Sequence, residues 1–147
     1  MKKLNFGAGK DLFDKEFTTL DVVDMPGIDI VHNANVFPYP IASEFYDYIK
    51  ANDILEHLDD VVKVMEELYR ILKVGGELFI RVPDGRIPEA IWADPTHKRG
   101  FVPISFDYFI PGTPSYNNYG FYTTAKFEKV SFREKNRGLE WLLKKIC

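Results

Sequence analysis

Two segments near the beginning of the chain carry residue types that are common where a protein binds a nucleotide. The apolar run Leu4–Phe6 leads into the turn Gly7-Ala8-Gly9, and Asp21 closes the next apolar run. Glycines permit positive φ angles and let a ligand approach the backbone closely. A carboxylate at the end of the neighbouring strand can accept hydrogen bonds from both hydroxyls of a ribose. Glycine pairs also serve purely structural turns, so both interpretations of this turn stay open here.

A second group of polar residues lies around the two histidines of the middle of the chain. His97 ends the turn that begins at Asp94, just before an aromatic stretch, and an imidazole can act as a general base near neutral pH. Asp94 either contacts a substrate or caps that turn. His57 begins a helix, where it either reaches the reacting groups or packs. Arg99 either binds an anionic substrate or is an ordinary surface charge.

Length and composition limit the possible classes of protein. With 147 residues and a formal net charge of −3, we expect one domain over 1–147, large enough for its own core. There is no Lys/Arg cluster of the nucleic-acid-binding type, and no apolar run approaches the length of a membrane span. The single cysteine is Cys147, so we expect no internal disulfide and no cysteine-based metal site, and no metal ligand is predicted. These features predict a cytoplasmic protein.

The connection after the glycine turn is too short for an ordinary crossover helix. Only eight residues separate Gly9 from the next apolar run, Lys10 to Phe17, whereas a crossover normally needs about a dozen. A dinucleotide site relies on a helix N-terminus to hold the pyrophosphate, and the carboxylate of Asp11 would repel phosphate. A nucleoside that carries an amino acid and no phosphate therefore fits better than a dinucleotide.

The order of apolar runs predicts an α/β fold with a mostly parallel sheet. A helix is expected over Asp59–Lys73, with Val61, Met65, Leu68 and Leu72 on one face and Gly75 as its stop. The five parallel strands are expected at Leu4–Phe6, Thr18–Val23, Ile28–His32, Phe45–Ala51 and Glu77–Val82.

The rest of the chain is expected to cover the sheet and complete it. Residues 84–125 are rich in aromatic side chains and prolines, which predicts an ordered lid or substrate-contacting segment. Phe127–Arg133 and Leu139–Ile146 are predicted to form an antiparallel hairpin around a compact turn, although the second run is also compatible with a short helix.

Two longer motifs identify a family. Asp53-Ile-Leu-Glu-His-Leu58 and Leu72-Lys-Val-Gly-Gly-Glu-Leu-Phe-Ile80 resemble the class I S-adenosylmethionine-dependent methyltransferases, specifically their small, type 11-like members. The resemblance runs from Leu4 to about Pro83, and the turn at Asp94 is similar to a segment of the same group. It implies a Rossmann-like fold with reduced helices and S-adenosylmethionine as the cofactor.

The resemblance also implies roles for individual residues. The glycine turn would line the methionine part of the cofactor, Asp21 would hold the ribose hydroxyls, and Asn33 would accept the adenine amino proton. Asn52 would lie beneath the cofactor, and Asn5 departs from the acidic residue usual at its position. The implied cofactor-binding residues are Asn5, Gly7, Ala8, Gly9, Asp21, Val22, Asn33, Ala34 and Asn52; His57 and His97 are the candidate catalytic residues, and Asp94 and Arg99 the candidate substrate contacts.

Three functions are compatible with these features. The first is a methyltransferase that acts on a small molecule or a sugar, as a monomer or homodimer, without nucleic-acid or membrane partners. The second is a catalytically degenerate module that only binds S-adenosylmethionine, which the short first crossover and Asn5 keep open. The third, a nicotinamide-dependent oxidoreductase, is disfavoured by the missing helix and by Asp11.

Overall fold

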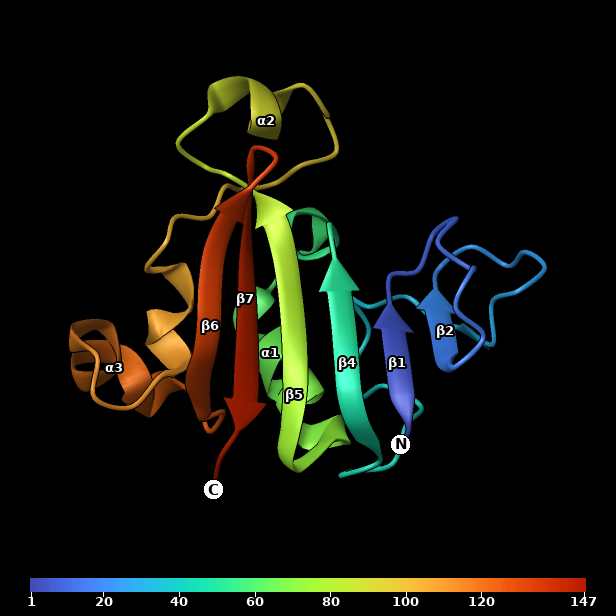
Figure 1. The fold of residues 1–147 in the computed structure, drawn as a ribbon, viewed down its shortest axis with the longest axis horizontal. Coiled ribbons are helices and arrows are strands. Elements are labelled where there is room, and N and C mark those ends of the chain that lie inside the picture. The colour runs from blue at the N-terminus through green and yellow to red at the C-terminus, as the bar shows by residue number, and fades with distance from the viewer.

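The computed structural model describes residues 1–147, and a single sheet runs through it (Figure 1). Its strands are β1 (Lys3–Phe6), β2 (Phe17–Asp21), β3 (Ile30–Val31), β4 (Tyr46–Asn52), β5 (Leu72–Pro83), β6 (Phe127–Lys135) and β7 (Gly138–Lys145). The spatial order is β3-β2-β1-β4-β5-β7-β6. The first five strands are parallel to one another, and β7 is antiparallel to both β5 and β6. The predicted Rossmann-like sheet with a C-terminal antiparallel hairpin is confirmed.

Few helices accompany this sheet. The α-helices are α1 (Val61–Ile71), α2 (Pro88–Trp92) and α3 (Pro114–Tyr119), and the 3₁₀ helices are η1 (Leu55–His57), η2 (Ser105–Phe109) and η3 (Gly120–Tyr122). No helix separates β1 from β2, as the length of that connection predicts. The parallel crossovers therefore contain one helix of full length, α1, between β4 and β5. No helix is both long enough and apolar enough to cross a membrane.

Helix α1 supplies the centre of the core. The side chain of Asp60 accepts a hydrogen bond from the backbone N–H of Lys63 and so caps the helix. Met65, Leu68 and Ile71 are fully buried against the sheet, and burying each such side chain is worth roughly 1.5–3 kcal/mol. The helix is shorter than Asp59–Lys73, because the chain turns directly into β5 at Leu72.

Strand β5 begins five residues before its predicted start. Leu72 pairs with Tyr46 of β4, the register then shifts, and regular pairing resumes at Glu77 opposite Tyr48. Gly75, expected to end the helix, lies inside this irregular part with a φ of 80°. Residues on both sides of Gly75 thus pair with β4. The local sequence could not show that β5 begins early, because this depends on pairing with a distant segment.

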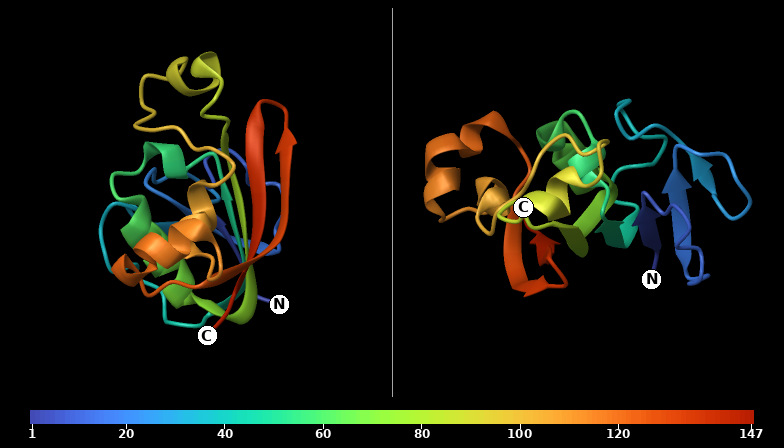
Figure 2. Two further views of the ribbon diagram at one scale, coloured as in Figure 1. Left: turned by 90° about the vertical axis from the view of Figure 1, so that its left-hand side faces the viewer. Right: turned by 90° about the horizontal axis from the view of Figure 1, so that it is seen from above.

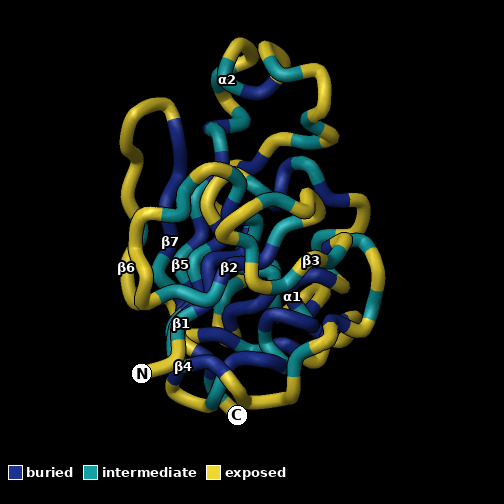
Figure 3. The backbone as a smooth tube through the Cα atoms, turned by 90° about the vertical axis from the view of Figure 1, so that its right-hand side faces the viewer, coloured by how far each residue is buried: buried dark blue, intermediate teal, exposed yellow.

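The aromatic segment 84–125 has two parts with different surroundings. Its first part, which carries α2, projects beyond the carboxyl ends of the strands, and Figure 3 shows this loop standing away from the rest of the chain. Its second part packs against the C-terminal hairpin, where the ring of Phe106 lies edge-on to Trp141 with centroids 4.7 Å apart. Both rings are about 1% exposed, so this part belongs largely to the core.

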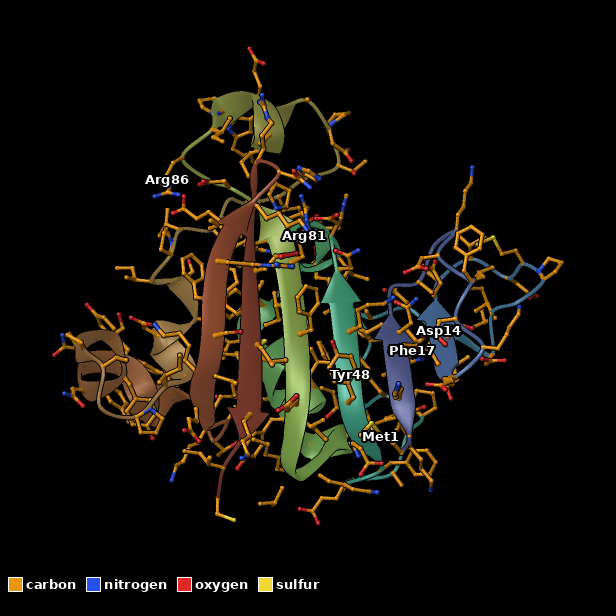
Figure 4. All side chains as sticks on the ribbon, viewed as in Figure 1. Met1, Asp14, Phe17, Tyr48, Arg81 and Arg86 are labelled. Carbon is orange, nitrogen blue, oxygen red and sulfur yellow. The ribbon has the colours of Figure 1, made fainter.

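The two faces of the sheet are covered unequally. In the left panel of Figure 2 the helices all lie on one side of the sheet. The opposite face carries partly exposed side chains, among them Phe17, Tyr48 and Arg81, which Figure 4 labels. Phe17 and Tyr48 meet edge to face with ring centroids 6.0 Å apart, and the ammonium of Lys50 lies 4.8 Å from the Phe17 ring centroid.

Candidate functional site

A cavity of about 400 Å³ lies at the carboxyl ends of β1, β2 and β4, and we call it the glycine-turn cavity. This is the position at which open α/β sheets bind their ligands. It brings together six of the predicted cofactor-binding residues with others from the same loops. Its lining residues are Gly7, Gly9, Leu20, Asp21, Val22, His32, Asn33, Ala34, Asn35, Asp53, Ile54, His57 and Leu58.

Asp21 organises the glycine turn. One carboxylate oxygen accepts a hydrogen bond from the backbone N–H of Gly9 at 2.8 Å, and the other accepts from the N–H of Val23 at 3.1 Å. The backbone N–H groups of Gly7 and Ala8 both donate to the carbonyl of Leu20. Each carboxylate oxygen has a second lone pair, so Asp21 can still accept hydrogen bonds from a ligand's hydroxyls.

Gly7 is required by both conformation and space. Its φ is +72°, and a Cβ at this position would lie 2.2 Å from Cδ1 of Ile54. Gly9 also has a positive φ, +54°, but nothing lies within 4 Å of the place where its Cβ would be. The first glycine therefore allows Ile54 to pack against the turn, and the second leaves the turn open.

Asn33 forms a local turn at the rim of this cavity. Its amide oxygen accepts a hydrogen bond from the backbone N–H of Asn35 at 2.9 Å. The oxygen retains a second lone pair, and the backbone carbonyl of Ala34 accepts from the hydroxyl of Tyr39. The structure thus shows a turn-forming role for Asn33 in addition to its place in the cavity.

Three predicted cofactor-binding residues do not line the cavity. Asn5 is 3% exposed, and its amide donates to the carbonyl of Asp11 at 2.9 Å. It thereby holds the loop that replaces the first crossover helix. Ala8 is buried, and Asn52 is exposed at the end of β4. Asp53, the next residue, lines the cavity instead. A cofactor contact for these three residues stays a prediction.

A second cavity of about 410 Å³ adjoins the first, and we call it the histidine cavity. It lies where η1, the end of β5, the α2 loop and the β6–β7 turn meet. Asp53 and His57 line both cavities. Its lining residues are Asp53, Glu56, His57, Arg81, Pro83, Ala90, Asp94, His97, Asn136 and Arg137.

Both histidines predicted to be catalytic lie in this cavity, in contact with each other. Their rings meet edge to face with centroids 4.6 Å apart. The side chain of His57 is 33% exposed, whereas that of His97 is 8% exposed. His57 is therefore the more accessible of the two, and it alone borders the glycine-turn cavity.

The turn at Asp94 is attached to η1 by hydrogen bonds. Thr96 donates through its hydroxyl and through its N–H to Asp94 Oδ1, at 2.6 and 2.9 Å. These hydrogen bonds, that of the hydroxyl above all, hold the pKa of Asp94 below its usual range. The N–H of Lys98 also donates to the carbonyl of Glu56 at 2.8 Å. Asp94 thus caps its own turn and lines the cavity at the same time.

Arg99 is engaged with the backbone of the same region. Its guanidinium donates to the carbonyls of Leu55, Leu58 and Asp59. These carbonyls lie in η1 and in the two residues that follow it, and that of Leu55 also accepts from the backbone N–H of Leu58. Arg99 lines neither cavity, and its predicted contact with substrate stays untested.

Glu56 is the functional candidate that the sequence did not reveal. Its side chain is fully buried, and neither carboxylate oxygen has a hydrogen-bond partner. Burial raises the pKa of Glu56 to about 7. The available signal was its position inside the Leu-Glu-His-Leu motif, but a helix-start pattern does not show which way a side chain points. Arg81, Asn136 and Arg137 were missed as well, because only the folded hairpin brings them to β5 and η1.

Known proteins resemble this chain in sequence and in fold. A family model described as a methyltransferase domain matches residues 1–144. The demethylmenaquinone methyltransferase of Listeria welshimeri is 36% identical over 56 residues, which are 37% of this chain and only 23% of that protein.

Solved structures share the fold at low sequence identity. A crystal structure of an S-adenosylmethionine-dependent methyltransferase from Archaeoglobus fulgidus has a TM-score of 0.71 and 14% identity, covering 98% of this chain and 86% of that one. The 1,6-didemethyltoxoflavin-N1-methyltransferase of Burkholderia thailandensis, with 1,6-didemethyltoxoflavin and S-adenosylhomocysteine bound, has a TM-score of 0.65 and 16% identity. That match covers 97% of this chain and 70% of that one.

Proposed function

The chain belongs to the methyltransferase-domain family and is an S-adenosylmethionine-dependent methyltransferase. From this premise we propose that its methyl acceptor is a small molecule bound in the histidine cavity. The specific candidate for the acceptor group is a sugar hydroxyl. The observation that carries the proposal is the pair of adjoining cavities that share Asp53 and His57. Two ligands bound there lie on either side of His57, within reach of one another.

The glycine-turn cavity suits the methyl donor. Its volume lies within the range of about 300–1,000 Å³ that is usual for small-ligand sites. We assign the ribose hydroxyls to the free lone pairs of Asp21 and the methionine part to the open backbone at Gly9. Asn33 would meet the adenine at the opposite end. A carboxylate already held by two backbone N–H groups keeps its orientation, which reduces the entropy lost on binding.

The methyl group is carried on a sulfonium, which is already activated, so the protein has mainly to align an acceptor behind it. Asp53 is well fixed for a residue at the border of the two cavities. It has a φ of 53°, and its carboxylate binds Arg81 at 2.6 Å. His57 is fixed through its ring Nδ1, 3.0 Å from the hydroxyl of Thr96. These two side chains would therefore set the distance between donor and acceptor.

A hydroxyl acceptor has to lose its proton during the transfer, and we assign the acceptance of that proton to His97. Its Nδ1 donates to the carbonyl of Ile91 at 2.6 Å, so its Nε2 carries the lone pair. The Nε2 atom lies on the side of Asp94, 3.5 Å from that carboxylate. A ring held in one tautomer is a general base that needs no rearrangement before it acts.

Names of related proteins support a small acceptor. The Listeria relatives are named for demethylmenaquinone, and the Burkholderia structure contains 1,6-didemethyltoxoflavin. In the histidine cavity itself, Arg81 and Arg137 contribute positive charge and Asn136 is polar. This lining suits a hydroxylated acceptor better than an apolar one, because hydroxyls find charged hydrogen-bond partners there.

The proposal is tested by measuring S-adenosylhomocysteine formation with panels of acceptors. Sugars and other small hydroxyl compounds are expected to give turnover above a reaction without acceptor. Turnover confined to protein or nucleic-acid acceptors would contradict the proposal. A thermal shift with S-adenosylhomocysteine, without turnover on any panel, would instead support a module that only binds the cofactor.

A further inference from the structure

Three side chains with metal-binding atoms converge at the inner end of the histidine cavity. Glu56 and His57 come from η1, and His97 comes from the α2 loop. One ligand atom from each residue lies within 4.8 Å of the others. We propose that Glu56, His57 and His97 bind one divalent transition-metal ion of the zinc class. This proposal does not rest on the identity of the acceptor, since the binding of an ion can be measured without methyl transfer.

The two imidazoles are held in the orientation and tautomer that a metal ligand needs. The Nδ1 of His97 donates to the carbonyl of Ile91. The hydroxyl of Thr96 donates to Asp94, so it can only accept from the Nδ1 of His57. Both rings therefore direct an unprotonated Nε2 toward Glu56. Metal-binding histidines characteristically donate their other ring N–H to an outer acceptor in this way.

Glu56 provides the independent observation. It is fully buried, and neither of its carboxylate oxygens has a hydrogen-bond partner. A buried carboxylate without a partner is costly, and most are paired, hydrogen-bonded or coordinated to a metal. Its Oε1 lies 3.7 Å from His57 Nε2 and 3.9 Å from His97 Nε2, too far for hydrogen bonds. The gap between these three atoms is the space that an ion would occupy.

The distances and ligand types favour zinc-like ions over magnesium or calcium. Ligand bonds of about 2.0–2.1 Å in a tetrahedral site place neighbouring ligand atoms roughly 3.4 Å apart. The two distances from Glu56 Oε1, 3.7 and 3.9 Å, need to close by about half an ångström or less, and the remaining distance, which lies within 4.8 Å, by no more than about 1.4 Å. Changes of side-chain rotamer allow movements of this size. Imidazole suits zinc, nickel and cobalt, whereas magnesium and calcium prefer sites made of oxygen ligands.

A candidate for the fourth ligand of a tetrahedral ion lies in the same cavity. Asp94 Oδ2 lies 3.5 Å from His97 Nε2, close to the ligand spacing of the other three atoms. Asp94 is half-exposed, so water or an oxygen atom of the acceptor can take its place. An ion bound by both Nε2 atoms uses the lone pair that we assign to proton acceptance, so His97 can accept the acceptor's proton only while the site holds no ion.

The experiment uses the full chain without an affinity tag, stripped with a chelator and dialysed. Zn²⁺ is titrated in competition with a chromophoric chelator, and Co²⁺ is added to a separate sample to record its visible absorption. We expect one equivalent of Zn²⁺ per chain and an intense Co²⁺ spectrum of the tetrahedral type. Absence of saturable binding by the unmutated chain would overturn the proposal.

Variants locate the site. Glu56→Gln keeps the shape of the side chain, and His97→Asn removes one imidazole. Each variant is expected to weaken Zn²⁺ binding at least about tenfold, because even the loss of a residue that only hydrogen-bonds to a metal ligand costs that much affinity. His32→Asn is the matched control, because His32 is the third histidine and lies outside the cluster. Equal affinity in all three variants would show that the ion binds elsewhere, and the proposal would fall.

Discussion

The glycine-turn cavity and the histidine cavity are neighbours of almost equal volume, but they are built in different ways. The first is shaped by backbone: two glycines with positive φ, an Asx turn at Asn33, and a carboxylate fixed by N–H groups. The second is lined mostly by ionisable side chains from four separate segments. A backbone-built site suits a ligand that does not change, whereas a site of side chains on loops can be altered residue by residue.

This difference in construction predicts that substitutions in the two cavities have different effects. Substitutions at the glycine-turn cavity should affect cofactor affinity or folding, because there the backbone itself is the site. Substitutions at the histidine cavity should affect turnover and leave cofactor affinity unchanged. The effect of His57, which borders both cavities, is expected to be mixed. Four measurements test the contrast.

The largest expected effect is that of His97→Asn on turnover. Removal of a general base usually costs roughly 10²–10⁴-fold in rate, whereas cofactor affinity should hardly change because His97 does not line the glycine-turn cavity. Steady-state kinetics and calorimetry with S-adenosylhomocysteine measure the two quantities separately. Near-normal turnover, or joint loss of cofactor binding and thermal stability, would show that the histidine is structural.

Asp21→Ala, in the glycine-turn cavity, is expected to affect cofactor affinity. Each hydrogen bond to a charged group is worth roughly 1.5–3 kcal/mol, so cofactor affinity should fall at least about tenfold. Asp24→Ala is the matched control, since Asp24 is exposed, lies three residues away and does not line the cavity. If calorimetry shows unchanged affinity with the fold intact, Asp21 does not bind the ribose hydroxyls.

Alanine at the two glycines tests whether the backbone of the turn is under different constraints at its two ends. Both substitutions place a Cβ at positive φ, which costs roughly 1–2 kcal/mol. Gly7→Ala also forces a clash with Ile54, so it should lose about 1–3 kcal/mol more than Gly9→Ala. Urea denaturation measures this difference. Equal losses would mean that Ile54 moves aside freely.

The smallest expected effect concerns the loop that closes the histidine cavity. Hydrogen bonds from Arg86 to the carboxylate of Asp84 hold the pKa of Asp84 below its ordinary value. The folded state is therefore stabilised at pH values above that ordinary value, and the stabilisation is lost as the pH falls through the lower folded pKa. Because Arg86 is half-exposed, the pair is worth no more than about 1 kcal/mol.

The measurement is a comparison of urea midpoints at neutral and strongly acidic pH. Arg86→Gln should lower the stability at neutral pH and make little difference once Asp84 is protonated in both states. Glu134 also pairs with Arg86, so the same experiment in a Glu134→Gln background isolates the Asp84 contribution. A loss that is the same at both pH values would exclude charge pairing as its cause.

The approximate positions of the strands could be predicted from the sequence, because each strand is a local apolar run with a turn at its end, whereas their spatial order comes from the structure. The hairpin at β6 and β7 was predicted for the same reason. Residues that line the glycine-turn cavity could be predicted where they end a strand or closely follow one, as Asp21 and Asn33 do. The contact between His57 and His97 could not be predicted, because the two are forty residues apart in sequence. Nor could the inward direction of Glu56, which only the packing of η1 decides.

The uncovered face of the sheet has a consequence for how copies of the chain meet one another. Phe17 and Tyr48 present aromatic surface there, and flat aromatic sheet faces promote stacking between molecules. Lys3 and Lys50 lie over the Phe17 ring, with ammonium groups 5.4 and 4.8 Å from its centroid. Any approaching copy must first strip water from these two cations. Both ammonium groups are also paired with carboxylates, those of Glu16 and Asp11, so the cost of desolvating two ion pairs is what opposes self-association through this face.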